Sequence, residues 1–181
     1  SCWRVELVGG MVFVHEPLPA ETPPVLAATD LPVSVIIIGG GAAGNAAAET
    51  LRQEGYAGSI TLLSADASPP CDRPNLSKDY LAGSASEDWI PLRPLDFYTE
   101  QRIELKLATR ASEIDPDAHT VRLSDGSRLS YGALLLATGA EPIRLDVPGA
   151  ALPHVHRLRT LADSRALVAA TADARHCVVG G

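Results

Sequence analysis

The sequence has few cysteines, few aromatic residues and no long apolar run. Its 181 residues include three cysteines, Cys2, Cys71 and Cys177, with no C-x-x-C or C-x-H spacing. This pattern excludes a redox dithiol motif within the chain and gives no zinc or iron–sulfur ligand set. Sparse, unpaired thiols are typical of a reducing compartment, so we expect a cytoplasmic protein. Because no stretch of about 18 apolar residues exists, we predict no membrane-spanning helix.

Charge and composition narrow the class of protein further. The net charge is −7 and no basic run is present, which argues against nucleic acid as a partner. Apolar residues at 46% and charged residues at 20% are ordinary globular values. His154 and His156 have no third ligand nearby, so they indicate a surface loop and no metal site. The length suits one α/β domain that buries roughly 70% of its unfolded surface.

The stretch from Val33 to Gly44, VSVIIIGGGAAG, is the most informative part of the sequence. Five of the six residues 33–38 are apolar, which predicts a strand buried on both faces. A G-x-G-x-x-G pattern and good helix formers follow. Gly39 allows a tight turn, Gly41 lets a pyrophosphate approach the backbone, and Gly44 lets the helix pack closely on the sheet. The helix N-terminus, with Ala42 and Ala43, would then hold the diphosphate.

An acidic residue follows the second predicted strand, residues 59–64, which completes a βαβ unit. Asp66 lies 22 positions beyond Gly44. An acidic residue at this offset suits a ribose hydroxyl of a bound dinucleotide. The alternative is a solvated aspartate in a turn, and the preceding glycine motif favours the ribose role.

A proline-stiffened segment, residues 68–80, carries two cations a few residues apart. Arg73 can contact a phosphate, and Lys78 can lie over an electron-rich ring system. The alternative is a surface loop with two solvated cations, and the residues alone do not decide between them. Asn75 or Ser77 is expected to cap a short helix that follows.

The rest of the chain predicts an α/β domain with an inserted meander. Short helices are expected at 94–101 and 160–170 and a strand at 103–107, with a meander of strands at 110–114, 119–123 and 128–130. The apolar strand 131–137 ends in Thr138 and Gly139. Because ligands lie beyond the carboxyl ends of parallel strands, these two residues and 39–44 are expected to share one crevice.

The two ends predict further domains. Residues 1–16 alternate around Gly9 and Gly10, which predicts a hairpin that is the last piece of a β domain. Residues 17–32 are a proline-rich linker. We expect residues 33–174 to be one domain, and 175–181 to start a second nucleotide-binding unit with a strand and a glycine turn. Both ends look cut, so we expect a fragment.

Taken together, these motifs resemble those of flavoproteins with two dinucleotide-binding domains, the pyridine-nucleotide-dependent reductases. GGGAAG after a strand, an acid after the second strand, ATGA after a meander, and a renewed VVGG occur in that family's order. SPPCDRPNLSK resembles the P-Y-x-R-P-x-L-S-K segment of ferredoxin and rubredoxin reductases and the apoptosis-inducing-factor group. RLRTLADSRAL resembles their stretch before the second nucleotide domain. The resemblance covers about residues 33–181 and implies a Rossmann-like FAD/NAD(P)-binding domain, truncated before the NAD(P)H domain.

The resemblance also implies roles for individual residues. The FAD diphosphate would lie on the glycine motif, the adenosine ribose on Asp66, and the adenine on the backbone of Ala111. Arg73 would contact FAD, and Lys78 would lie near the isoalloxazine, where its charge tunes the flavin as the catalytic residue. The residues that would close over the cofactor are Ala137, Thr138 and Gly139. Cys71 stands where the family usually has tyrosine, and a small apolar filler is favoured there over a reactive thiol.

The implied function is an FAD-dependent NAD(P)H oxidoreductase that passes electrons to an iron–sulfur protein. The acceptor would be a ferredoxin or a fused Rieske domain, since the N-terminal hairpin resembles the closing strands of a Rieske-type domain. The alternatives are a flavin-dependent oxidase or monooxygenase, a redox-sensing flavoprotein with a signalling role, and a site for NAD alone. NAD(P)H would be bound by the missing downstream domain, so the isolated fragment is expected to be inactive.

Overall fold

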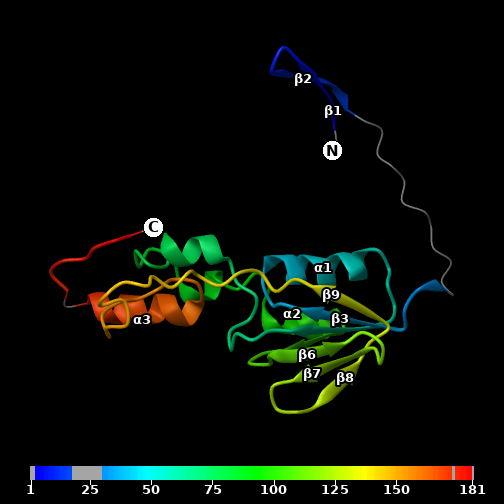
Figure 1. The fold of residues 1–181 in the computed structure, drawn as a ribbon. Helices are drawn as coiled ribbons and strands as arrows, with labels where there is room; N and C mark the ends of the chain where they lie inside the picture. Colours follow the sequence, from blue (N-terminus) through cyan, green and yellow to red (C-terminus); the bar gives the residue numbers. More distant parts are fainter. Residues whose placement is uncertain (1–2, 18–29, 173, 181) are drawn as a thin grey trace. The chain divides into compact units, whose positions relative to one another are not determined.

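The computed structural model describes residues 3–17, 30–172 and 174–180. They belong to two units, residues 1–31 and 32–181. In the first unit, strands β1 (Trp3–Val8) and β2 (Met11–Pro17) pair antiparallel around Gly9 and Gly10, which both have positive φ. The predicted hairpin therefore forms (Figure 1). Most of the predicted linker, as well as Cys2 and Gly181, lies outside the described residues.

The second unit is built on a four-stranded parallel sheet with the order β5-β4-β3-β9. Its strands are β3 (Ser34–Ile38), β4 (Ser59–Leu63), β5 (Ile103–Lys106) and β9 (Ala133–Leu136). The three-isoleucine strand β3 is central, with Ile37 opposite Leu62 on one side and Leu135 on the other. A central parallel strand is covered on both faces, which is why its sequence is almost continuously apolar.

Two different layers cover the two faces of this sheet. Helices α1 (Ala42–Gln53) and α2 (Leu95–Glu100) pack on the face that carries Val35 and Ile37. The other face, with Ile36 and Ile38, packs against an antiparallel meander on the side opposite α1 (Figure 1). The meander strands are β6 (Ala111–Asp115), β7 (Thr120–Leu123) and β8 (Arg128–Ser130). Burying each isoleucine contributes roughly 1.5–3 kcal/mol, so both layers hold the sheet. The predicted Rossmann-like α/β domain with an inserted meander is confirmed.

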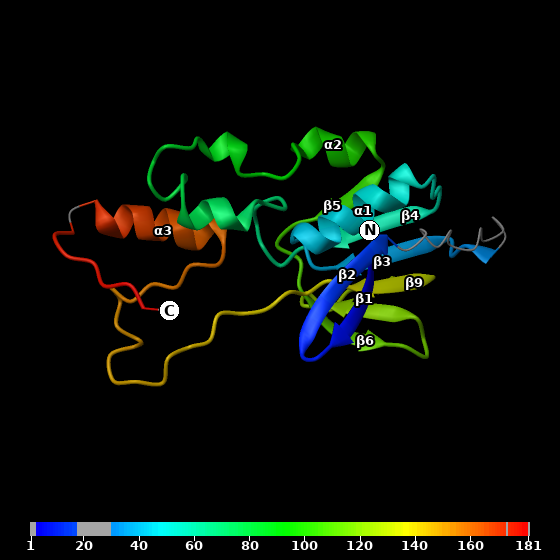
Figure 2. The same ribbon diagram turned by 90° about the horizontal axis from the view of Figure 1, so that it is seen from above.

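A small separate core joins the proline-rich segment to the last helix. The 3-10 helix η2 (Arg73–Ser77) lies in this segment, and a second one, η3 (Glu87–Trp89), follows it. Helix α3 (Leu161–Thr171) lies beside η2 (Figure 2). The residues of this core are Cys71, Leu76, Ile90 and Leu161.

The structure corrects the expected cap in this segment. The helical turn is η2 itself, and residues 78–83 form turns where a short helix was expected. The side chain of Asn75 accepts a hydrogen bond from the Tyr80 N–H at 3.1 Å, and the Ser77 hydroxyl donates to the Pro74 carbonyl at 3.2 Å. Both side chains therefore form hydrogen bonds with the local backbone of a turn. Asn and Ser side chains often do so, and these bonds compete with capping of a helix.

The strand expected to open at His176 is absent, which is a second correction. Residues 176–180 have no regular structure, and Val178 and Val179 are 96% and 90% exposed. A strand obtains its hydrogen bonds from a neighbour, and none of the described strands pairs with this segment. That a second nucleotide-binding unit starts at residue 175 stays a prediction.

Within the described ranges, none of the helices combines the length and the apolar character needed to cross a membrane.

Arg52 ties the end of α1 to two other elements. Its guanidinium donates to the backbone carbonyls of Tyr56 (2.6 Å), Gly58 (2.9 Å), Gln101 (2.7 Å) and Arg102 (2.7 Å). The first two carbonyls lead into β4 and the last two end α2. Because the five donors of an arginine form a rigid fork, one side chain can satisfy all four acceptors.

We therefore predict that Arg52→Lys lowers the free energy of unfolding by about 2 kcal/mol, since one ammonium cannot reach four carbonyls. Urea denaturation measures this loss. The matched control is Arg122→Lys, where the guanidinium is exposed and forms an ion pair with Glu113 at 3.0 Å. That control is expected to change stability by less than about 1 kcal/mol. Equal losses in the two variants would contradict the role given to Arg52.

Candidate functional site

The carboxyl edge of the parallel sheet brings three separate segments together. The glycine-rich loop follows β3, Asp66 follows β4, and Thr138 and Gly139 follow β9. Ala137 N–H donates to the carbonyl of Ile38 at 2.8 Å, and Gly39 N–H donates to the carbonyl of Leu63 at 2.9 Å. The loops after β3, β4 and β9 therefore share one edge, as expected for a crevice at the carboxyl ends of parallel strands.

Backbone packing requires two glycines of the loop, and a third, Gly40, is crowded by the buried side chain of Ser64. A Cβ on Gly39, which has φ +127°, would overlap the carbonyl of Ala137. A Cβ on Gly44 would overlap the carbonyl of Gly39, because the start of α1 lies directly against the end of β3. Any larger residue at these positions would force the helix or β9 away from β3.

Gly41 is different, because no backbone crowds it. The nearest atoms to a Cβ there belong to the Arg73 guanidinium, 4.0 Å away. Gly41 is also the N-cap of α1, and no acidic side chain occupies the first turn of that helix. The N–H groups of Ala42, Ala43 and Gly44 have no acceptor within the helix, and they carry its positive dipole end. The open side of Gly41 is thus suited to an anionic group.

Arg73 lies at the meeting point of these loops. Its guanidinium forms an ion pair with Asp66, with Nη2 3.4 Å from Oδ2. The same group is 4.0 Å from the Cβ position of Gly41 and 3.9 Å from that of Gly139. Both side chains of the ion pair are about one-third exposed, so the pair is open to a ligand. A guanidinium in this place can bind a phosphate in a bidentate manner.

A second guanidinium, from Arg159, faces the same place and was not predicted from the sequence. Its Nη2 lies 3.0 Å from the Cβ position of Gly139. The backbone N–H of Arg159 donates to the carboxylate of Asp163 at 3.0 Å, and that carboxylate also accepts from Thr160 N–H in the capping box of α3. The T-x-x-D pattern could have shown that Arg159 precedes a fixed helix start. It could not have shown that Gly139 lies opposite.

Three other predicted residues lie in the core between sheet and meander, at the end of η2 and in the small core beside α3. Ala111 is half-buried and packs in the core between sheet and meander. Lys78 is exposed at the end of η2 and forms none of the ion pairs found in the described part of the chain. Cys71 is buried, and burial raises the pKa of its thiol. A raised pKa is the opposite of what a reactive thiolate needs.

A buried polar network supports the start of α1 from behind, and sequence reasoning missed it. The Tyr98 hydroxyl donates to Asn45 Oδ1 at 2.6 Å, and Asn45 Nδ2 donates to Glu49 at 2.6 Å. Glu49 also accepts from Arg93 at 3.0 Å. Burial raises the pKa of Tyr98 to about 12, so its hydroxyl stays a donor at neutral pH. The network connects α2 to the residue that directly follows Gly44.

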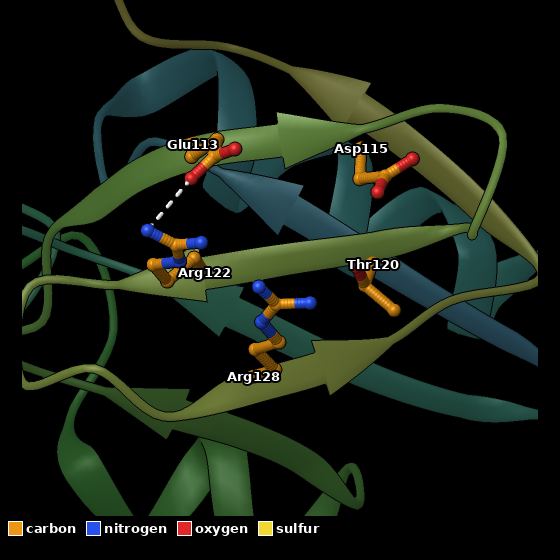
Figure 3. A pocket seen from close by; sticks show the side chains of 5 residues that line it. All are labelled: Glu113, Asp115, Thr120, Arg122 and Arg128. Atoms are coloured by element: carbon orange, nitrogen blue, oxygen red, sulfur yellow. Dashed lines mark ion pairs between the residues drawn. The ribbon is translucent and has the colours of Figure 1, made fainter.

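A separate small hollow on the outer face of the meander is an ordinary solvated surface (Figure 3). It is lined by Glu113, Asp115, Thr120, Arg122 and Arg128. Glu113 and Arg122 form an ion pair at 3.0 Å, and their side chains are 55% and 42% exposed. These side chains point away from the core because strand residues alternate between faces. The hollow is not part of the crevice at the carboxyl edge.

Comparison with known proteins points to one group. Residues 33–181 match the family model described as "Pyridine nucleotide-disulphide oxidoreductase". Rhodocoxin reductase of Rhodococcus erythropolis is 41% identical over 149 residues, which cover 82% of this chain and 35% of the relative.

Two solved structures are also similar. The ferredoxin reductase for the CYP199A2 system from Rhodopseudomonas palustris has a TM-score of 0.74 at 41% identity, covering 77% of this chain and 34% of that chain. The reductase in the covalent putidaredoxin reductase–putidaredoxin complex has a TM-score of 0.70 at 39% identity, covering 75% of this chain and 33% of that chain. The chain thus spans about a third of the length of the relatives it matches.

Proposed function

The chain belongs to the pyridine nucleotide-disulphide oxidoreductase family, and on that premise we propose that it is the FAD-binding part of a reductase. The reductase passes electrons from NAD(P)H through FAD to an iron–sulfur protein. The observation that carries this proposal is the open side of Gly41, which faces the Arg73 guanidinium at the N-terminus of α1.

The residues at the crevice suit the parts of FAD. The diphosphate fits the N–H groups at the start of α1, with Arg73 on one side and Arg159 beside Gly139. Asp66, which pairs with Arg73, is placed to accept hydrogen bonds from the adenosine ribose. The remaining contacts that we assign to FAD come from Ala111, Ala137, Thr138 and Gly139.

When bound, FAD supplies the redox chemistry, accepting a hydride from NAD(P)H and releasing single electrons to the acceptor. The residues of this chain bind and orient the cofactor. The exposed ammonium of Lys78 adds positive charge near the ring system, where it favours the reduced, electron-rich form. We assign NAD(P)H binding to a domain that starts at residue 175.

The names of the relatives support an iron–sulfur acceptor. One is a ferredoxin reductase, and another was crystallised with putidaredoxin. We extend this to a ferredoxin-like protein or a fused Rieske domain as the partner of this protein. The cysteines found free, Cys71 and Cys177, favour a reducing cytoplasm as its location.

The N-terminal hairpin supports the idea of a fused domain. One of its faces carries Val5 and Leu7 opposite Val14 and Val12, and all four side chains are more than 60% exposed within this unit. A two-stranded hairpin is marginally stable in water and needs further strands to cover such a face. We therefore assign residues 1–16 to the end of a β domain of Rieske type, joined to the FAD domain by the linker 17–32.

Gly41→Ala tests the FAD site directly. Its backbone (φ −91°, ψ −172°) accepts alanine and its Cβ side is open, so we expect stability to change by less than about 1 kcal/mol. The added methyl occupies the phosphate approach, so FAD affinity should fall at least about tenfold. Quenching of flavin fluorescence in the full-length protein measures the affinity, and thermal unfolding measures the stability.

The matched control is Thr50→Ala, an exposed change on the same helix that is expected to leave FAD affinity unchanged. A Gly41→Ala variant with wild-type affinity would contradict the placement of the diphosphate. A colourless wild-type protein that binds only NAD would overturn the whole proposal.

Lys78→Ala is expected to lower the flavin midpoint potential, because removing a cation destabilises the reduced, electron-rich ring. A dye-equilibrated redox titration of the FAD-loaded full-length protein measures this. The control is Lys106→Ala, whose ammonium is paired with Glu104 at 2.7 Å on the outer strand β5. An unchanged potential in the Lys78 variant would refute the tuning role.

The 181 residues alone are expected not to oxidise NAD(P)H, because they span about a third of the relatives and the nicotinamide site is assigned to the region after residue 175. Steady-state NAD(P)H consumption with added FAD tests this. Measurable turnover would contradict the assignment of the nicotinamide site to the region after residue 175.

A further inference from the structure

The segment that carries Arg73 and Lys78 has little structure of its own. Its 3-10 helix η2 has five residues, and the N-cap Asp72 makes no side-chain capping hydrogen bond. Short 3-10 helices have poor hydrogen-bond geometry and depend on their surroundings. Before η2, the backbone is fixed by Asp72 N–H, which donates to the carbonyl of Ile90 at 2.8 Å. The middle of η2 must be held by something else.

Helix α3 supplies that support through one buried hydroxyl. Ser164 is fully buried, and its Oγ donates to the carbonyl of Leu76 at 2.8 Å. Leu76 is itself 1% exposed and packs against Leu161 of α3. Its carbonyl lies three residues after Arg73 and two before Lys78, so the hydrogen bond fixes the middle of the segment that presents both cations.

Helix α3 is in turn anchored from its outer side. Arg165 donates to both carboxylate oxygens of Glu87, and the Tyr80 hydroxyl donates to the same carboxylate at 2.7 Å. The capping box fixes the helix start, immediately after Arg159. One helix therefore sets the position of two guanidiniums at the crevice: Arg159 through its own backbone, and Arg73 through Ser164 and η2.

We propose that Ser164 is a positioning residue of the FAD site, which acts through the Leu76 carbonyl to hold Arg73 against the diphosphate and Lys78 beside the ring system. This inference rests on the proposed FAD site. The carbonyl of the buried Leu76 needs a hydrogen-bond partner. Without the hydroxyl, η2 would shift to expose that carbonyl to water. Arg73 and Lys78 would then move away from the FAD site together with η2.

A double-mutant cycle with Arg73 tests the proposal in the full-length, FAD-loaded protein. Ser164→Ala should weaken FAD binding about tenfold and lower the flavin midpoint potential. If Ser164 acts through Arg73, the same change in an Arg73→Ala background should weaken FAD binding by less than about threefold. A purely structural role would lower the melting temperature without this coupling.

The matched control is Ser34→Ala, which also removes a hydroxyl bonded to backbone. Ser34 Oγ accepts from Gly132 N–H at 2.9 Å, at the start of β3 and thus at the opposite end of the strand from the crevice. This variant should leave FAD affinity unchanged and be additive with Arg73→Ala. If Ser164→Ala does not fold, Ser164→Cys provides a slightly larger side chain with a weaker donor, and it is also expected to weaken FAD binding.

The outcomes separate the two proposals. If the wild-type protein binds FAD and the Ser164 variants bind it as tightly, or if Ser164→Ala and Arg73→Ala are additive, the positioning role is wrong and the FAD site stands. If the wild-type protein binds no FAD, the proposed function fails and this inference fails with it.

Discussion

The contact between the start of α1 and the end of β3 is the constraint on which the site depends. Gly44 lies directly against the carbonyl of Gly39, and a single Cβ would push the helix away. This contact directs the free N–H groups of the first turn to the carboxyl edge of the sheet, where the loops after β4 and β9 also begin. The network from Tyr98 to Asn45 holds the same helix end from behind. The contact between Gly44 and Gly39 therefore both packs the helix on the sheet and places the N–H groups that can bind an anion.

Much of this could be predicted from the sequence because it is local. The glycine spacing, the isoleucine run and the turns of the meander each specify a conformation within a few residues, and the strands expected between residues 33 and 137 are present. The capping box at Thr160 is local as well.

The parts that could not be predicted depend on tertiary contacts. Nothing near Arg159 or Ser164 in the sequence indicates that they meet Gly139 and Leu76, which are distant along the chain. The strand expected at His176 is absent although its local sequence favours one. None of the described strands offers this segment hydrogen bonds. The helix expected after Asn75 was wrong because that side chain bonds the backbone of its own turn.

The ion pair between Arg73 and Asp66 is better explained by binding than by stability. Both side chains are about one-third exposed, and such pairs contribute less than about 1 kcal/mol to folding. The pair nevertheless leaves each group able to form more hydrogen bonds. The guanidinium has further donors and lies about 4 Å from the Cβ positions of Gly41 and Gly139, and the carboxylate has further lone pairs. A dinucleotide presents acceptors on its diphosphate and donors on its ribose. In the proposed FAD site, this weak pair would hold a group that binds the diphosphate next to a group that binds a ribose hydroxyl.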